Sequence, residues 1–244
     1  MPAFDVSEHD AIKQSVQFEK EIKRAVRPYV LPTLLLYDAG VYRIWNPYIW
    51  ECPTSSLQEH FDRYVRSIHL EAGCGTGYLP DRCRRFDNRS AGDLHKQWML
   101  TLLDYSPGSL AWAGRKLRRY QPHLIRHNLF HPLPHLSHRF ESICLNYVLH
   151  CLPGSFAQKE KVIANLKAVM TPEGVLFGST ILGTDAAKNN GAGAILKLYN
   201  FIGSFHNTHD TAEDLAVALS NNFQYHACRV IGSVALFAAS DRKL

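Results

Sequence analysis

The sequence lacks closely spaced cysteine pairs and any cluster of metal-ligating side chains. Its six cysteines are dispersed, and none of them forms a C-x-x-C pair. The thirteen histidines are equally scattered, with no carboxylate cluster between them. We therefore expect no metal site, and we expect free thiols in a reducing compartment, the cytoplasm.

Long apolar runs and dense positive charge are also missing. No apolar run reaches the ~18 residues of a membrane span, and the N-terminus lacks the apolar core of a signal peptide. The formal net charge is +5, and the nearest approach to a basic cluster lies at residues 115–119. That run fits the solvated face of one helix, because a nucleic-acid interface needs more charge and interleaved aromatics. We expect neither a membrane nor a nucleic-acid partner.

What the sequence does contain is a glycine-rich stretch at residues 67–78, Ser-Ile-His-Leu-Glu-Ala-Gly-Cys-Gly-Thr-Gly-Tyr. It predicts a short buried strand, an acidic residue at its end, three alternating glycines and a helix. Such a corner is typical of a cofactor site, because glycine lets the backbone run close against a ligand. A dinucleotide fingerprint would need a glycine where Tyr78 stands. Glu71 would repel a pyrophosphate and suits a cationic group, such as an α-amino group.

Apolar runs farther along the chain predict the rest of a sheet. The second strand ends at Asp104, where a carboxylate can accept both ribose hydroxyls of an adenosine. By itself Asp104 could also be a helix cap, and the glycine stretch favours the ribose role. The Tyr105 ring can pack against adenine. Besides the strand of the glycine stretch, strands are expected at 98–104, 123–126, 140–150 with its exit and 174–182, with a closing antiparallel hairpin at 225–231 and 234–239.

The run E-x-G-x-G-x-G from Glu71 to Gly77 resembles the first motif of the class I S-adenosylmethionine-dependent methyltransferases. From Thr54 to Ala239 the order of expected elements is similar to their core, and residues 46–54 resemble small methyltransferases encoded beside secondary-metabolite pathways. The resemblance implies a Rossmann-like, seven-stranded, mostly parallel α/β sheet with helices on both faces and an antiparallel C-terminal hairpin. It divides the chain into a helical N-terminal extension or lid, residues 1–53, and a methyltransferase domain, residues 54–244.

The same resemblance implies a pocket that binds S-adenosylmethionine and releases S-adenosylhomocysteine. Asn128 stands where many relatives have an aspartate that binds the adenine amino group, and its amide oxygen can accept the same hydrogen bond. The end of the fourth strand lies where cofactor and substrate meet. The expected cofactor-binding residues are Glu71, Gly73, Cys74, Gly75, Gly77, Asp104, Tyr105, Asn128, Leu129, Asn146 and Tyr147.

The candidate bases are His150, His206 and His127, in that order, and the first two are the expected catalytic residues. The methyl group of S-adenosylmethionine is already activated, so alignment of the nucleophile is the main task. A histidine base is needed only if the nucleophile is a neutral hydroxyl or amine. For His150 the alternative is a structural histidine bonded to backbone. No N-P-P-Y or D-P-P-Y run follows the fourth strand, so the usual signature for methylating a planar amide or base nitrogen is missing.

Two segments are candidates for shaping a substrate site. Residues 30–50 crowd aromatic and aliphatic side chains, which fits a helix packed on the domain and equally a lid over the active site. An insertion from residue 183 to about residue 210 follows the fifth strand, where the family commonly places substrate-selecting elements, and Asn189-Asn190-Gly191 predicts a flexible entry to it. The expected substrate contacts are Tyr37, Tyr42, Trp45 and Tyr199.

We therefore expect a methyltransferase that acts on an oxygen, nitrogen or carbon nucleophile of a small secondary metabolite, as a monomer or homodimer. The alternative keeps the fold and catalyses a non-methylating step, such as a pericyclic reaction or a cyclisation in natural-product biosynthesis. A non-catalytic partner subunit is disfavoured, because a pocket that binds no cofactor would not need Glu71, the glycines and Asp104. Fold alone does not decide between these functions.

Overall fold

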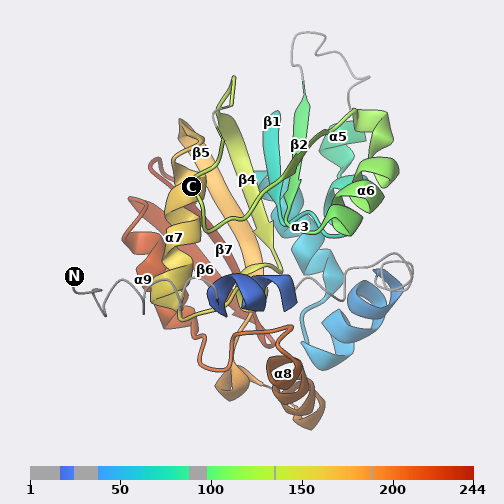
Figure 1. Ribbon diagram of the computed structural model, residues 1–244, viewed down its shortest axis with the longest axis vertical. Helices are drawn as coiled ribbons and strands as arrows, with labels where there is room; N and C mark the ends of the chain where they lie inside the picture. Colours follow the sequence, from blue (N-terminus) through green and yellow to red (C-terminus); the bar gives the residue numbers. More distant parts are fainter. Residues whose placement is uncertain (1–16, 25–37, 88–97, 135, 188) are drawn as a thin grey trace, which may run out of the picture.

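The computed structural model describes residues 17–24, 38–87, 98–134, 136–187 and 189–244 (Figure 1). At its centre is a seven-stranded sheet in the order β3-β2-β1-β4-β5-β7-β6. β7 runs antiparallel to β5 and β6, while the other paired strands are parallel. The strands are β1 (Ile68–Ala72), β2 (Met99–Asp104), β3 (His123–Arg126), β4 (Phe140–Asn146), β5 (Met170–Ile181), β6 (Tyr225–Ile231) and β7 (Val234–Ser240). The predicted Rossmann-like sheet with its C-terminal hairpin is confirmed.

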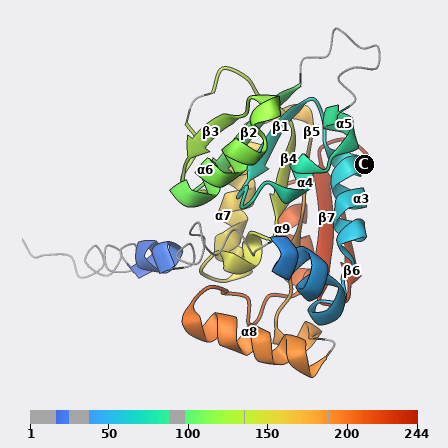
Figure 2. The same cartoon turned by 90° about the vertical axis from the view of Figure 1, so that its right-hand side faces the viewer.

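Helices cover both faces of this sheet, as predicted (Figures 1 and 2). One face carries α3 (Thr54–Tyr64), α4 (Tyr78–Asp81), α5 (Arg84–Asp87) and α6 (Pro107–Lys116), and the other carries α7 (Phe156–Lys167) and α9 (Ala212–Ser220). Phe61 and Phe177 are buried in the first core layer, whereas Val162 and Leu215 are buried in the second. Because β1 and β4 are covered on both sides, most of their side chains are buried, including the polar side chains of His69, Glu71 and Ser142.

A third group of elements lies at the carboxyl ends of the parallel strands, where Figure 2 shows α8 below the sheet. It comprises α8 (Asn190–Ile202), the helical residues 17–24, the π-helix η1 (Val41–Ile49) and the short helices η4 (Leu149–Cys151) and η5 (Thr184–Ala186). The remaining short helix, η3 (Arg118–Tyr120), follows α6. Residues 1–16 and 25–37 lie outside the described part, and the domain division at residue 53 stays a prediction.

Two boundaries differ from the sequence prediction. β5 begins at Met170 rather than at residue 174, because a bulge between Phe140 and Ser142 lets the strand pair with β4 earlier. The expected flexible entry at residues 189–191 is instead a capped helix start. The Asn189 Oδ1 accepts the Ala192 N–H at 2.8 Å, and its Nδ2 donates to the Ile49 carbonyl at 3.1 Å. Asn189 therefore ties α8 to η1.

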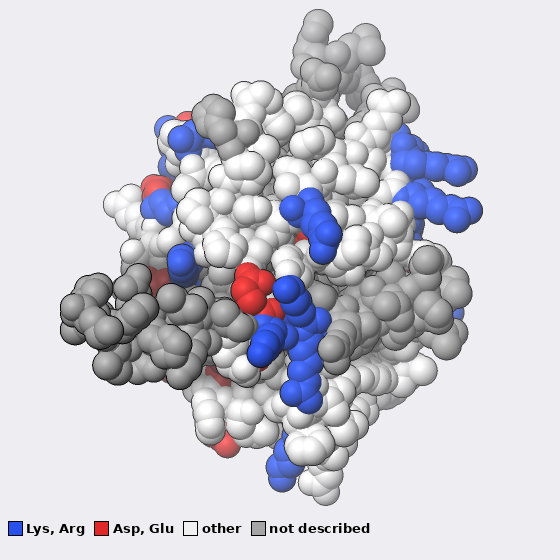
Figure 3. Space-filling view, in the orientation of Figure 1, with Lys and Arg blue, Asp and Glu red and all other residues white. Residues whose placement is uncertain are grey.

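Charged side chains are distributed in small groups over the face of the molecule that Figure 3 shows. On this face, lysine and arginine side chains form several separate groups, one of them beside acidic side chains at the centre. Within the described ranges, no helix is both long and apolar enough to cross a membrane. Over the same residues, no group of three or more histidine, cysteine, aspartate or glutamate side chains is placed to hold a metal ion.

Candidate active site

A pocket opens at the carboxyl ends of β1, β2 and β4 and is continued by residues from the N-terminal segment. Ten of the eleven predicted cofactor-binding residues line it: Glu71, Gly73, Cys74, Gly75, Asp104, Tyr105, Asn128, Leu129, Asn146 and Tyr147. Gly77 is not among its lining residues. The fold thus brings together side chains from four separate stretches of the sequence, because the ends of parallel strands meet at one edge of a sheet.

The glycine loop between β1 and α4 needs glycine for three different reasons. The first reason applies to all three glycines of the loop, which have positive φ: +78° at Gly73, +49° at Gly75 and +68° at Gly77. A Cβ at Gly73 would come within 2.4 Å of a Val148 methyl, and a Cβ at Gly77 would come within 2.8 Å of Leu117. A Cβ at Gly75 would meet open space. Gly73 and Gly77 therefore permit packing, and Gly75 keeps a lining position of the pocket clear.

Glu71 is the last residue but one of β1, the strand that leads into this loop, and its side chain is buried in the pocket wall. Among the described residues, its Oε2 has no hydrogen-bond partner, although His69 Nε2 lies 3.5 Å away. A buried carboxylate that lacks a compensating charge is unfavourable. An ammonium group in the pocket would supply that charge.

Asp104 ends β2 and faces the same loop. Its Oδ2 accepts the Gly75 N–H at 3.1 Å, and its Oδ1 accepts the Ser106 N–H at 2.8 Å. Burial raises the pKa of Asp104 to about 6, and these two backbone N–H groups lower it in part. Each oxygen has a second lone pair, so the carboxylate can still accept the two hydroxyls of a ribose.

Beyond Asp104, the pocket wall continues through Tyr105 and Asn128. The Asn128 Oδ1 already accepts the Phe130 N–H at 3.1 Å, while its Nδ2 donates to the Glu19 carboxylate at 2.9 Å. The Tyr105 hydroxyl lies 3.5 Å from the same carboxylate. The helical residues 17–24, which are far from residues 105 and 128 in the sequence, therefore contact the end of the pocket that is expected to hold adenine. Sequence reasoning did not find Glu19, because nothing local links it to residues 105 and 128.

Tyr147, at the exit of β4, has a backbone conformation that is uncommon for a residue with a side chain, with φ +56°. Its N–H donates to the Ser179 carbonyl at 2.8 Å, and its hydroxyl donates to the buried Asn46 Oδ1 at 3.0 Å. Asn146 is also engaged, because its Oδ1 accepts the Ser179 hydroxyl at 2.5 Å. Asn46 from η1 therefore fixes a ring in the pocket wall, which was not predicted.

His150 follows on η4 and is almost completely buried. Its Nδ1 accepts the Ile181 N–H at 3.2 Å, so the neutral ring carries its hydrogen on Nε2. Burial, with the nearby Lys159 charge, lowers the pKa of His150 to about 3. This is the arrangement of the backbone-bonded structural histidine named above as the alternative. A catalytic role for His150 stays an untested prediction.

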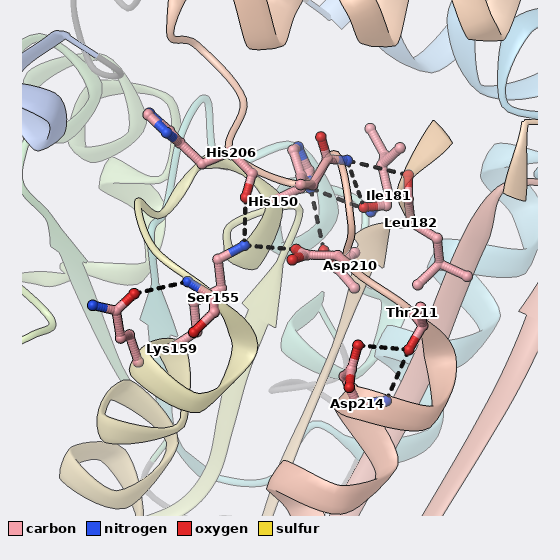
Figure 4. Close-up of polar contacts among 12 residues, drawn as sticks. His150, Ser155, Lys159, Ile181, Leu182, His206, Asp210, Thr211 and Asp214 are labelled. Atoms are coloured by element: carbon pink, nitrogen blue, oxygen red, sulfur yellow. Dashed lines mark hydrogen bonds and ion pairs between the residues drawn. The ribbon is translucent and has the colours of Figure 1, made fainter. Parts of the chain in front are cut away.

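His206 lies in the segment between α8 and α9 and is not among the pocket-lining residues. Its N–H donates to the His150 carbonyl at 2.7 Å, and its own carbonyl accepts from Lys159 Nζ at 2.8 Å. In Figure 4 its side chain points away from Lys159 and Asp210. Burial lowers the pKa of His206. Its backbone thus anchors the segment, and its catalytic role also stays a prediction.

The expected substrate contacts fall into two places, with Tyr37 outside the described residues. Tyr42 lines the cofactor pocket and stacks on Tyr78, with ring centroids 3.6 Å apart. Trp45 packs on Tyr199 at 5.5 Å. Tyr199 stacks on Phe205 at 4.9 Å, and Phe205 meets the His150 ring at 4.5 Å. Aromatic rings therefore form a continuous row from the pocket wall at Tyr147 to η1 and α8.

Asp38 fastens the N-terminal segment to the glycine loop. It accepts hydrogen bonds from the Thr76 hydroxyl and from Lys116 Nζ, both at 2.5 Å. Ile22 lines the pocket from the other described piece of this segment. The segment thus contacts both the loop and the far end of the pocket, which fits the predicted lid as well as a packed helix.

The residues present fit S-adenosylmethionine. The Glu71 carboxylate, which lies in the pocket wall without a compensating charge, would face its ammonium group, and Asp104 would hold its ribose. The open space at Gly75 gives room for the methionine part against the loop. When bound, this cofactor supplies a methyl group activated by the sulfonium charge.

Comparison with known proteins identifies the family. Residues 70–176 match a family model described as a methyltransferase domain. The chain is 34% identical over 223 residues to the methyltransferase verB of Penicillium polonicum, covering 89% of this chain and 98% of that protein. It is 31% identical over 211 residues to the demethylluteothin O-methyltransferase of Streptomyces thioluteus. That alignment covers 86% of this chain and 88% of that protein. Among solved structures, the DhpI–SAH complex matches with a TM-score of 0.61 and 15% identity, covering 91% of this chain and 98% of that chain.

These findings favour methyl transfer over the non-methylating alternative. Both relatives carry the name methyltransferase, and each alignment covers most of this chain and most of the relative. The solved structure shares the fold. The pocket is lined by ten of the residues predicted to bind this cofactor. The chain belongs to the S-adenosylmethionine-dependent methyltransferases.

Proposed function

We propose that the protein methylates the oxygen of an acidic hydroxyl, a phenol or an enol, on a flat aromatic small molecule of secondary metabolism. The observation that carries this proposal is His150, the histidine nearest the end of β4. Its Nδ1 is occupied by the Ile181 N–H, and its pKa is lowered to about 3. A histidine in that state takes up no proton at neutral pH, which favours an acceptor that ionises without His150. His127, which lines the pocket, is the remaining candidate base.

The row of aromatic rings supports a flat acceptor. It begins at Tyr147 in the pocket wall and passes through His150 and Phe205 to Tyr199 and Trp45. Stacked and edge-on contacts with such rings favour planar aromatic ligands. The demethylluteothin O-methyltransferase is named for an oxygen acceptor, which agrees with this choice.

In the proposed reaction the protein acts mainly by positioning. Glu71 binds the cofactor ammonium, Asp104 binds the ribose, and the exit of β4 with Tyr147 borders the place where the acceptor oxygen approaches the methyl group. Holding two reactants in line can lower the barrier by roughly 7–11 kcal/mol. The aromatic row keeps water from the anionic oxygen, which raises its reactivity.

The test is methyl transfer from labelled S-adenosylmethionine to matched sets of aromatic compounds that carry a hydroxyl, an amino or a hydroxymethyl group at the same ring position. We expect the phenols to be methylated, at rates that rise with pH as more of the acceptor ionises. Equal or faster methylation of the amines or benzylic alcohols would contradict the proposal. Gly75→Arg is the control without cofactor binding, because its side chain starts from open space at the pocket and should block the cofactor; circular dichroism should check that it folds despite the positive φ at this position.

The cytoplasmic location and the monomeric or homodimeric state remain predictions. Size-exclusion chromatography with light scattering at micromolar protein concentration would decide the oligomeric state. A mass of a single chain, 27.7 kDa, would exclude the homodimer under those conditions.

A further inference from the structure

His69 lies on β1, two residues before Glu71, so that both side chains point to the same face of the sheet. Its ring is completely buried among Phe61, Phe86 and Phe177, with ring centroids 5.5, 6.1 and 6.0 Å away. An imidazole among aromatic rings is unfavourable unless both of its nitrogens have polar partners. The partners of those nitrogens therefore indicate why a histidine stands here.

The first partner of the ring is Ser142 on β4. The Ser142 Oγ accepts the Arg66 backbone N–H at 2.8 Å and lies 2.8 Å from His69 Nδ1. Ser142 is fully buried, and among the described residues no other acceptor is bonded to its hydroxyl. The hydroxyl hydrogen therefore goes to Nδ1. In the neutral ring, this leaves the remaining hydrogen on Nε2.

The second partner is Glu71. His69 Nε2 is 3.5 Å from Glu71 Oε2, and neither atom has a hydrogen-bond partner within the described residues. The opposite tautomer would direct a lone pair at the carboxylate, which is repulsive. The chain from the Arg66 N–H through Ser142 and His69 thus ends at an Nε2–H that lies 3.5 Å from one oxygen of a pocket-lining carboxylate.

We infer that His69 is a positioning residue, whose Nε2–H holds the Glu71 carboxylate in the orientation that receives the α-ammonium group of S-adenosylmethionine. The inference rests on the proposed cofactor role of Glu71. A carboxylate fixed in advance loses less freedom when the ligand binds, so that more of the interaction is available as affinity. The effect is confined to the amino-acid end of the cofactor, because His69 lies behind Glu71 and far from the residues at the adenine end.

The test compares two ligands by calorimetric titration. S-Adenosylhomocysteine carries the amino-acid group, and 5′-methylthioadenosine lacks it. His69→Phe suits the aromatic surroundings and removes the N–H, whereas His69→Gln can place an amide N–H near the position of Nε2. We expect His69→Phe to raise the Kd of S-adenosylhomocysteine roughly tenfold or more and to change the Kd of methylthioadenosine by less than about twofold. His69→Gln should restore a large part of the lost affinity.

Three results would overturn the inference. A folded His69→Phe protein with wild-type affinity for S-adenosylhomocysteine would show that the contact between His69 and Glu71 does not contribute to binding. An equal loss for both ligands would show a merely structural role. Nitrogen-15 spectra of the wild-type protein, which need no variant, should show His69 protonated on Nε2, and the Nδ1-protonated neutral form would contradict the argument. If the folded wild-type protein bound neither ligand, the cofactor assignment itself would fail.

Discussion

Replacing Lys159 with methionine tests what holds the segment between α8 and α9. Lys159 on α7 is completely buried, and its Nζ donates to Asp210 Oδ2 at 2.6 Å and to the His206 carbonyl at 2.8 Å (Figure 4). Methionine has a similar length but carries no charge. Lys159→Met therefore leaves the Asp210 carboxylate, which is only 6% exposed, without its cation.

Removing one partner of a buried ion pair costs about 3–5 kcal/mol of unfolding free energy. In a domain of this size, such a loss lowers the Tm by roughly 6–20 °C. The loss should depend on pH. Burial raises the pKa of Asp210 even with Lys159 beside it, and without Lys159 this pKa rises further. A raised folded-state pKa favours the protonated acid, so the variant should regain stability as the pH falls toward the unfolded-state pKa of about 4 and lose it as the pH rises.

The assay is urea unfolding of the wild-type protein, Lys159→Met and the double variant Lys159→Met/Asp210→Asn, at pH 5 and pH 7.5. The double variant should recover most of the stability, because it contains no buried charge without a partner. A loss below about 1 kcal/mol for the single variant at pH 7.5, the size typical of exposed pairs, would refute the reasoning. The reasoning would also be refuted if the double variant were as unstable as Lys159→Met alone.

Three further predictions concern the pocket. Gly73→Ala should lower the unfolding free energy by roughly 2–4 kcal/mol in urea titrations, because its Cβ meets Val148 at a positive φ, whereas Gly75→Ala should cost less. Since burial raises the pKa of Asp104 to about 6, S-adenosylhomocysteine should bind more weakly as the pH falls through 6, and Asp104→Asn should remove that pH step in titration calorimetry. Glu19→Gln should raise the Kd of methylthioadenosine several-fold, and unchanged affinity would show that Glu19 only packs at the surface of the pocket.

The glycine loop and the strand ends could be predicted from the sequence because their chemistry is local. Three alternating glycines after an acid predict a loop at which the backbone runs close to a ligand. Gly73 and Gly75 line the pocket, and all three glycines have positive φ. Asp104 follows directly from an apolar run that must be a buried strand. The topology of the sheet then places all these groups at one edge.

The contacts made by the N-terminal segment could not be predicted in the same way. Glu19 with Asn128, Asp38 with Thr76, and Asn46 with Tyr147 each join residues that are far apart in the sequence. The occupied Nδ1 of His150 likewise depends on the backbone of β5, which no local pattern reveals. The role of His69 could not be predicted either, because the sequence reveals neither the tautomer nor the partner of a histidine in a buried strand.

The contacts of the N-terminal segment have a kinetic consequence. Asp38 holds the segment on the glycine loop, and Glu19 holds it at the opposite end of the pocket, while η1 on the same segment carries Tyr42. Each contact involves a carboxylate, and Lys116 also pairs with Asp38, so we expect added salt to weaken them. We therefore expect added salt to accelerate the departure of S-adenosylhomocysteine, which stopped-flow measurements at several ionic strengths would check.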